Sequence, residues 1–215
     1  MTDPYWPLFD LRLTTPDLQL TTATEADQVG LSALMSADVE PDPAAPSYNV
    51  ADDGLRLGIY THQAYWKAFG TWRPESWTLP FAVRRDGELI GLQQLEGEDF
   101  AVLRTVDSFS FLATRARGRG YGKQMREAVL ALAFGPLAAV RAITSAWRDN
   151  HASLGVSRAL GYVANGETLN RREADVDVMV HLRLSRDDWL ARTDRPTVDI
   201  AGFEPCRPLF GLQAS

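Results

Sequence analysis

The sequence contains little cysteine and no long apolar run. Its one cysteine, Cys206, excludes an internal disulfide and a cysteine metal cluster, which is typical of a reducing compartment. The longest apolar run begins at Ala128, is broken by Gly135 and Pro136, and is too short to span a bilayer. The first ten residues also lack the charged and apolar parts of a signal peptide. These absences predict a cytoplasmic protein.

An excess of positive charge is missing as well. The formal net charge is −6 and the pI is about 5.1, so the overall field repels nucleic acids and anionic membranes. The three histidines, His62, His151 and His181, are scattered without the spacing of metal ligands. We therefore expect no nucleic acid, no membrane and no metal as partners.

Length and composition favour one domain. With 215 residues and 45% hydrophobic content, the chain can bury one sizeable core but is short for two. We expect a single domain over residues 1–215. Within it, residues 38–80 are rich in proline, aspartate and aromatic side chains and form a long variable segment, and residues 185–215 form a C-terminal extension.

Hydrophobic periodicity and turn signals alternate strands with helices. Asp86-Gly87 joins two alternating runs into a hairpin, and the stripe of Met125, Val129 and Leu132 marks a helix that Gly135 ends. We expect strands at residues 18–24, 81–85, 88–97, 103–113, 141–147 and 174–184, and helices at 24–37, 57–69, 120–134, 150–161 and 185–192. This order predicts the α/β class, with a mixed sheet and helices on its faces.

The run "RARGRGYGKQMR", residues 115–126, packs five cationic side chains and three glycines into an acidic chain. It lies between an expected strand and an expected helix, where free N–H groups and the helix dipole favour an anion such as phosphate. The P-loop pattern fails because Gln124 stands where a hydroxyl should bind magnesium, and the dinucleotide pattern fails on glycine spacing.

Residues 117–122, "RGRGYG", resemble the R/Q-x-x-G-x-G/A signature of the GNAT acyltransferase superfamily. Residues 149–162, "DNHASLGVSRALGY", resemble a helix motif of its RimJ/RimL-type branch. The resemblance covers about residues 80–184. It implies the GNAT fold, a strongly curved mixed sheet flanked by helices and splayed between its fourth and fifth strands, at residues 104–113 and 141–147.

The resemblance implies an N-acyltransferase that moves an acyl group from an acyl-CoA to a primary amine of a protein N-terminus, a lysine or a small molecule. Acetyl-CoA is the favoured donor, and succinyl-CoA or another acyl-CoA stays open. The implied CoA-binding residues are Ser110, Phe111, Leu112, Arg117, Gly118, Arg119, Gly120, Tyr121, Gly122, Lys123, Asn150, Ser153 and Ser157. Asn150 can also simply cap its helix, and Ser157 can be a surface serine.

The resemblance also implies catalytic roles. Ser153 occupies the position from which RimL-type enzymes protonate the departing CoA thiolate, and Asp107 lies where many GNAT enzymes place a carboxylate base. Glu167 is a second candidate base. Phe109 and Phe111 stand where the family strand usually has glycine and tryptophan, so Phe109 is expected to narrow the acyl end of the site.

Two other function classes stay open at this point: a non-catalytic acyl-CoA sensor on the same fold, and a nucleic-acid binder that uses the arginine run. The expected partner is an amine-bearing acceptor, a peptide, protein or small molecule, and a homodimer is an open alternative to a monomer. Aromatic and acidic residues of the variable segment are expected to line the acceptor pocket: Tyr48, Tyr60, Tyr65, Trp66, Trp72 and Trp77, with Asp38, Glu40, Asp42, Asp52 and Asp53.

Overall fold

The structure, a computed structural model, describes residues 3–35, 48–172 and 174–213. Its described strands form one nine-stranded sheet in the order β7-β8-β6-β5-β4-β3-β2-β1-β9. Every pairing is antiparallel except that of β5 with β6. The strands are β1 Arg12–Thr14, β2 Gln19–Thr22, β3 Trp77–Arg85, β4 Glu88–Gly97, β5 Thr105–Leu112, β6 Arg141–Trp147, β7 Val163–Arg172, β8 Asp175–Ser185 and β9 Asp199–Ala201. The predicted α/β class with a mixed sheet is confirmed.

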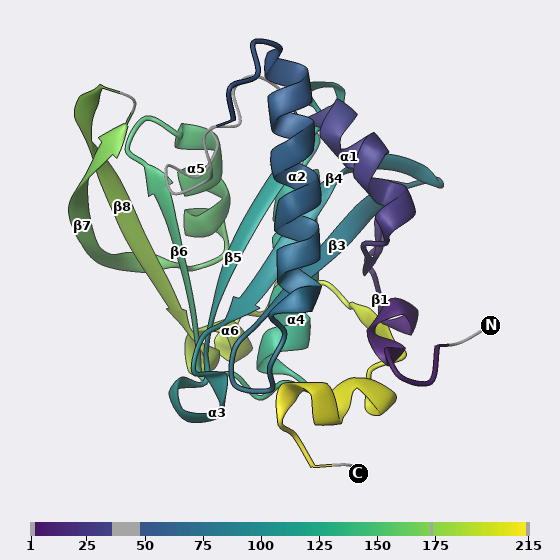
Figure 1. Cartoon of the computed structure of the whole chain (residues 1–215). Helices are drawn as coiled ribbons and strands as arrows, with labels where there is room; N and C mark the ends of the chain where they lie inside the picture. Colours follow the sequence, from purple (N-terminus) through teal and green to yellow (C-terminus); the bar gives the residue numbers. More distant parts are fainter. Residues whose placement is uncertain (1–2, 36–47, 173, 214–215) are drawn as a thin grey trace.

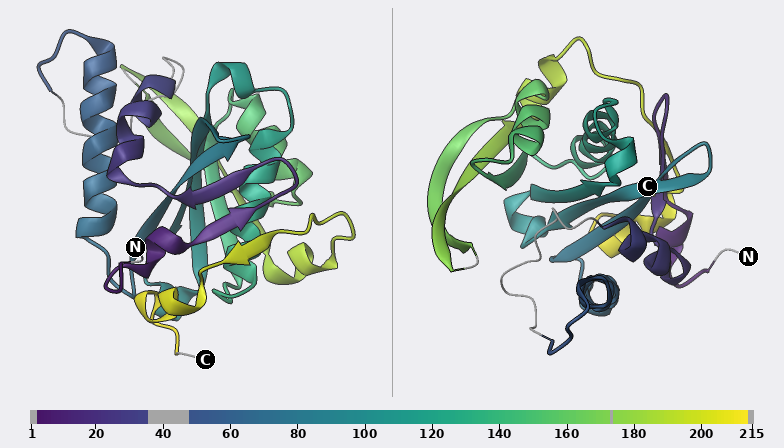
Figure 2. Two further views of the ribbon diagram at one scale, coloured as in Figure 1. Left: turned by 90° about the vertical axis from the view of Figure 1, so that its right-hand side faces the viewer. Right: turned by 90° about the horizontal axis from the view of Figure 1, so that it is seen from above.

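Helices cover both faces of this sheet. One face carries α4 and α5, and the other carries α1 and α2, as the view along the sheet shows (Figures 1 and 2). The helices are α1 Gln28–Leu34, α2 Asp53–Gly70, α3 Phe100–Leu103, α4 Tyr121–Phe134, α5 His151–Ala159 and α6 Arg186–Ala191, and the 3₁₀ turns are η1 Pro7–Asp10, η2 Glu25–Asp27, η3 Thr114–Ala116 and η4 Glu204–Phe210.

The main core lies between α4 and the sheet. Met125, Val129 and Leu132 of α4 are fully buried, as their helical spacing predicted. They pack in one cluster with apolar residues of β3 such as Leu79 and Phe81. A smaller cluster under α1 holds Ala23, Leu31, Ala82, Leu92 and Phe111. Membership of a cluster therefore shows which way a strand side chain points: toward α4 in the main core, or toward α1 in the smaller cluster.

The hairpin of β3 and β4 turns at the predicted dipeptide. Asp86 has φ 49° and Gly87 has φ 82°, so both central residues lie in the left-handed region that a two-residue hairpin turn of this kind requires. The strand β3 begins at Trp77, four residues before the expected start, so it takes in the end of the variable segment. This tight turn fixes which residues of β4 face which residues of its neighbours.

Three strands were not predicted. Almost every residue of β7 is exposed, so it lacks the apolar alternation that marks a strand, and it forms because β8 pairs along it. The short strands β1 and β9 pair at the other edge of the sheet.

The helix α2 begins four residues before the expected start, because the Asp52 carboxylate caps it by accepting the N–H of Leu55 at 2.7 Å.

The C-terminal extension packs into the main core. Phe210 lies 4.9 Å from the Trp77 ring and 5.3 Å from the Trp72 ring, and the indole N–H of Trp72 donates to the Leu209 carbonyl at 2.8 Å. These tryptophans therefore pack in or against the core, and their role in lining an acceptor pocket stays a prediction. Tyr65 is likewise buried. The predicted pocket residues Asp38, Glu40 and Asp42 lie outside the described residues.

No helix within the described ranges is long and apolar enough to cross a membrane.

Candidate functional site

The sheet opens between β5 and β6. These strands pair in parallel only at Thr105 with Arg141 and at Val106 with Ala142. Beyond these two pairs β5 continues along β4, and β6 continues along β8, so their facing edges separate (Figure 1). The predicted splay between the fourth and fifth expected strands is confirmed, and it lies between β5 and β6 because the short β1 precedes them.

One edge of β5 presents main-chain groups to this splay. The Arg104 carbonyl accepts the N–H of Val140 at 2.8 Å on the β6 side, whereas the Ala113 N–H donates to the Ile90 carbonyl at 2.9 Å on the β4 side. Main-chain groups alternate in direction along a strand. Those that point into the splay therefore belong to Ser108, Ser110 and Leu112.

Phe111 differs from its predicted partners Ser110 and Leu112. It is the register partner of Leu92 on β4, and its ring is buried under α1, so neither its main chain nor its side chain faces the splay. The Leu112 carbonyl accepts a hydrogen bond from Nε of Arg117 at 3.1 Å. Of the three predicted residues, Ser110 therefore offers the most accessible pair of main-chain groups.

The glycine turn, residues 117–122, leads from β5 into α4. Gly118 has φ 73° and Gly120, the N-cap of α4, has φ 81°, and no heavy atom lies within 4 Å of a Cβ placed on either. The Arg117 N–H donates to the Thr114 carbonyl at 3.2 Å, and the next N–H with a backbone acceptor in the described part is that of Lys123, which donates to the Gly120 carbonyl at 3.1 Å. The N–H groups of residues 118–122 are therefore available to an anion.

The side chains of the turn have different environments. Arg119 is exposed. Tyr121 is buried in the core with the Arg85 guanidinium over its ring at 5.2 Å. The prediction that Tyr121 binds CoA is therefore restricted to its main-chain N–H. A Cβ placed on Gly122 would stand 3.7 Å from Val156 of α5, an ordinary contact distance, so this part of the turn lies beside α5.

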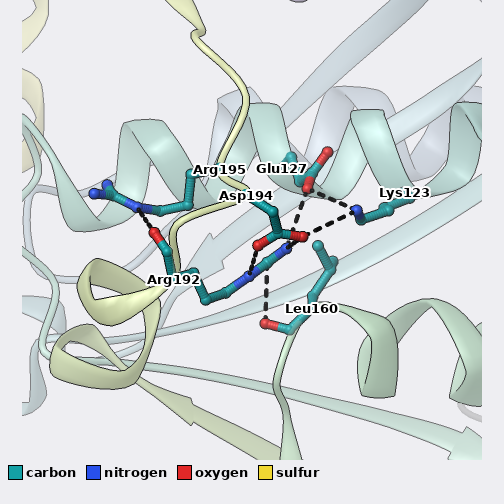
Figure 3. A network of polar contacts seen from close by, with 6 residues as sticks. All are labelled: Lys123, Glu127, Leu160, Arg192, Asp194 and Arg195. Atoms are coloured by element: carbon teal, nitrogen blue, oxygen red, sulfur yellow. Dashed lines mark hydrogen bonds and ion pairs between the residues drawn. The ribbon is translucent and has the colours of Figure 1, made fainter.

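Lys123 takes part in an ionic network with the C-terminal extension (Figure 3). Its Nζ lies 3.5 Å from Oε1 of Glu127 and 3.7 Å from Oδ2 of Asp194. Arg192 forms two hydrogen bonds to Asp194, at 3.0 and 2.9 Å, and donates to the Leu160 carbonyl at 3.2 Å. Burial raises the pKa of Glu127, and Lys123 and Arg192 oppose that rise. The expected phosphate contact of Lys123 therefore competes with two carboxylates.

The helix α5 presents Ser153 on the side of the glycine turn. The Asn150 side chain accepts the N–H of Ser153 at 3.1 Å, which confirms its capping role. Ser153 lies one turn before Val156, whose side chain lies beside Gly122, so Ser153 and Val156 share a face of α5. Ser157 is buried and its hydroxyl donates to the Ser153 carbonyl at 3.1 Å, so it is not the surface serine considered from the sequence.

A carboxylate pair, Glu96 and Asp107, lies across β4 and β5. The two residues are direct register partners. Burial raises the pKa of Asp107, while the Ser108 N–H, which donates to it at 2.6 Å, and the Arg126 charge lower it. Glu96 accepts a hydrogen bond from the Gln94 side chain at 2.6 Å. Glu96 was missed from the sequence, because its place opposite Asp107 depends on the register of β4 with β5, which no local pattern indicates.

The carboxylate pair faces the α1 and α2 side of the sheet, as does Phe109, which is 40% exposed. The reason is the register: Leu92 and Phe111, four residues away on their strands, pack under α1 on that same face. Glu167 lies elsewhere. It pairs with Arg148 at 2.7 Å and lines a hollow of about 460 Å³ behind α5, to which Tyr162 also contributes.

The chain matches the family model described as acetyltransferase (GNAT) domain over residues 17–163. Its fold is similar to that of RimL, a ribosomal L7/L12 alpha-N-protein acetyltransferase in complex with coenzyme A, with a TM-score of 0.63, 14% identity and coverage of 81% of this chain and 97% of that one. Mycobacterium smegmatis RimJ in complex with CoA-disulfide gives a TM-score of 0.64, 18% identity and coverage of 88% and 97%.

A spermidine N-acetyltransferase chimera from Vibrio cholerae SpeG and hSSAT gives a TM-score of 0.64, 14% identity and coverage of 82% and 99%. At these identities the solved structures establish the fold. The family match spans more than half of the chain and includes the splay, the glycine turn and the α5 cap. The chain therefore belongs to the GNAT acetyltransferase family.

Proposed function

We propose that the chain transfers an acyl group from an acyl-CoA to a primary amine. The observation that carries the proposal is the splay, because an open strand edge ends there at a glycine-capped helix N-terminus. An extended pantetheine arm carries amides that can pair with the main chain of Ser110, and a pyrophosphate can accept the N–H groups of residues 118–122. RimL and RimJ, which share the fold, are in complex with CoA and CoA-disulfide respectively.

The proposed reaction is direct attack by the amine on the thioester. The nitrogen lone pair forms a bond to the acyl carbon, and a main-chain N–H on the open edge of β5 stabilises the developing oxyanion. The carbon–sulfur bond then breaks. The Ser153 hydroxyl gives its proton to the departing thiolate, and the Asp107 carboxylate accepts the proton that the nitrogen releases.

The carboxylate pair supports an amine as the acceptor. Glu96 and Asp107 lie side by side on the face of the sheet opposite α4, so an ammonium group there is attracted and held near the acyl carbon. Burial raises the pKa of Asp107, which strengthens it as a proton acceptor. The names of RimL and SpeG give a protein α-amine and spermidine as acceptors of those proteins. The carboxylate pair suits either kind of amine.

The role of Ser153 distinguishes an enzyme from an acyl-CoA sensor. Ser153→Ala removes one oxygen, while the Asn150 side chain still accepts the N–H of residue 153. We expect kcat to fall by about 10²-fold with little change in acyl-CoA affinity, the effect of a lost general acid. The measurement is release of free CoA thiol with a matrix of peptide and polyamine acceptors, together with calorimetry of acyl-CoA binding.

The sensor alternative makes the opposite prediction. It needs the glycine turn but neither Ser153 nor the carboxylate pair. Wild-type protein that binds acyl-CoA tightly and releases no thiol with any amine tested would establish the sensor. If kcat of Ser153→Ala falls by only a few-fold, Ser153 positions the substrate and is not the general acid. The transferase proposal would still stand.

A further inference from the structure

A buried arginine lies beside the splay without a carboxylate partner. Arg126 of α4 is 4% exposed and donates to the Thr144 hydroxyl on β6 at 3.2 Å. Its Nε has no hydrogen-bond acceptor among the described residues, and no carboxylate there lies within ion-pair distance of it. A buried guanidinium without a carboxylate is unfavourable, so this site lacks a negatively charged group.

Two buried hydroxyl groups nearby also lack partners. The Tyr162 hydroxyl and the Ser108 hydroxyl are buried and form no hydrogen bond with any described residue. Arg126 lies close enough to Tyr162 to act on its pKa, which burial raises and the guanidinium lowers, but the contact does not reach hydrogen-bond geometry. Three polar groups, one of them charged, are therefore available for further hydrogen bonds.

The strand register places these groups at the point where β5 and β6 separate. The last paired residues are Val106 and Ala142, and both are buried in the α4 cluster. Two residues further along each strand, Ser108 and Thr144 share that face. We call this set, Ser108, Arg126, Thr144 and Tyr162, the deep end of the splay.

The deep end lies where the acyl group would be. In the proposed function, on which this inference rests, pantetheine runs along Ser110 and Leu112 from the glycine turn. The thioester and acyl group then reach the next inward-facing position of β5, which is Ser108. An acyl chain that continues past the thioester on the α4 side meets the Arg126 guanidinium.

We propose that the deep end binds an acyl group that ends in a carboxylate, as in the CoA thioester of a dicarboxylic acid. A carboxylate accepts two hydrogen bonds from a guanidinium and further bonds from hydroxyls. It thus supplies the charge and the acceptors that Arg126, Tyr162 and Ser108 lack. An uncharged acyl group of the same length leaves Nε of Arg126 and the hydroxyls of Tyr162 and Ser108 buried without partners.

Arg126 has one competing role, as a distant counter-ion for Asp107, whose pKa its charge lowers. That role does not depend on which acyl-CoA is the donor. If it is the whole role, removing the guanidinium changes activity with every acyl-CoA by the same factor and shifts the pH profile equally for all of them. Discrimination between a charged and an uncharged donor of equal length is therefore the decisive quantity.

The test compares succinyl-CoA with butyryl-CoA in full-length wild type, Arg126→Met, Tyr162→Phe and the control Arg158→Met, which alters an exposed arginine on α5. We expect wild type to favour succinyl-CoA by about 30-fold in kcat/KM, since a charge-assisted contact is lost with butyryl-CoA. Arg126→Met should remove this preference, Tyr162→Phe should reduce it about fivefold, and Arg158→Met should keep it.

Calorimetry of the two thioesters without acceptor separates this inference from the proposed function. Tighter binding of succinyl-CoA that depends on Arg126 supports the deep end even if no amine is acylated. Equal use and equal binding of both donors by wild type overturns the inference while the transferase stands. A preference unchanged in Arg126→Met also overturns it, and Tyr162→Phe keeps the test valid if Arg126→Met does not fold.

Discussion

The two ends of the splay present different kinds of groups to a ligand. The glycine turn presents main-chain N–H groups on an exposed helix N-terminus, with charged side chains around it. The deep end presents buried side chains that come from α4, β5, β6 and the residue before β7. The first kind depends on glycine spacing in one segment, whereas the second depends on how distant segments pack.

The largest expected effect breaks the glycine end alone. Gly120→Asp places a carboxylate beside the phosphate donors, and we expect acyl-CoA affinity to fall by at least about 10²-fold in a folded protein. Gly120→Asn is the matched control, because asparagine has nearly the same shape, no charge and a better tolerance of positive φ. Calorimetry that finds equal affinities for the two variants would remove the phosphate role of the turn.

The next effect is at the carboxylate pair, on the opposite face of β5 from the deep end. Asp107→Asn should lower kcat/KM by about 30-fold at neutral pH, because the proposed base is lost. In wild type, burial raises the pKa of Asp107 above its ordinary 3.8, so activity should rise with pH through that raised value. If kcat/KM of Asp107→Asn rises with pH over the same acidic range as that of wild type, the rise is due to the titration of another group.

The same substitution has a consequence for stability. A raised pKa means that the folded protein holds the proton more tightly than the unfolded chain, so wild-type stability falls as pH rises from 3.8 through the raised value. Asp107→Asn lacks this loss. Its thermal midpoint relative to wild type should therefore be higher at neutral pH than below pH 3.8, in melts at matched ionic strength.

The smallest effect sharpens the role of the extension. Asp194→Asn removes one of the two carboxylates near Lys123 but keeps the side-chain volume. We expect acyl-CoA to bind about threefold more tightly, an effect of surface-charge size that salt should weaken. Asp187→Asn, on the exposed side of α6, is the control. Weaker binding in Asp194→Asn would mean that Asp194 orients the turn through Arg192.

Local signals in the sequence predicted much of the glycine end. The Asp86-Gly87 turn, the apolar stripe of α4 and the Asn150 cap each depend on neighbouring residues, and all three are confirmed. The splay was implied by the family resemblance and is confirmed by the two-pair contact of β5 with β6. Features of this kind can be identified because a few adjacent residues determine them.

The remaining features depend on long-range pairing. Glu96 faces Asp107 only through the register of β4 with β5, and Arg126 reaches Thr144 across the interface of α4 with β6. Asp194 approaches Lys123 because the extension folds back along α4, which no pattern near Lys123 indicates. The strand β7 has no apolar face at all and depends on β8 for its pairing.

The short contact between β5 and β6 has a mechanical consequence. In the described chain, two register pairs are all the strand pairing that joins the block β7-β8-β6 to the rest of the sheet. A pantetheine arm bound along the free edge of β5 would take the place of a neighbouring strand. It would then contact both parts of the sheet and hold them together. Substrate at 100 times its dissociation constant adds about 2.7 kcal/mol to the free energy of unfolding by mass action alone. In this molecule the bound substrate would contact both β5 and β6. It would therefore stabilise the association of the two parts of the sheet.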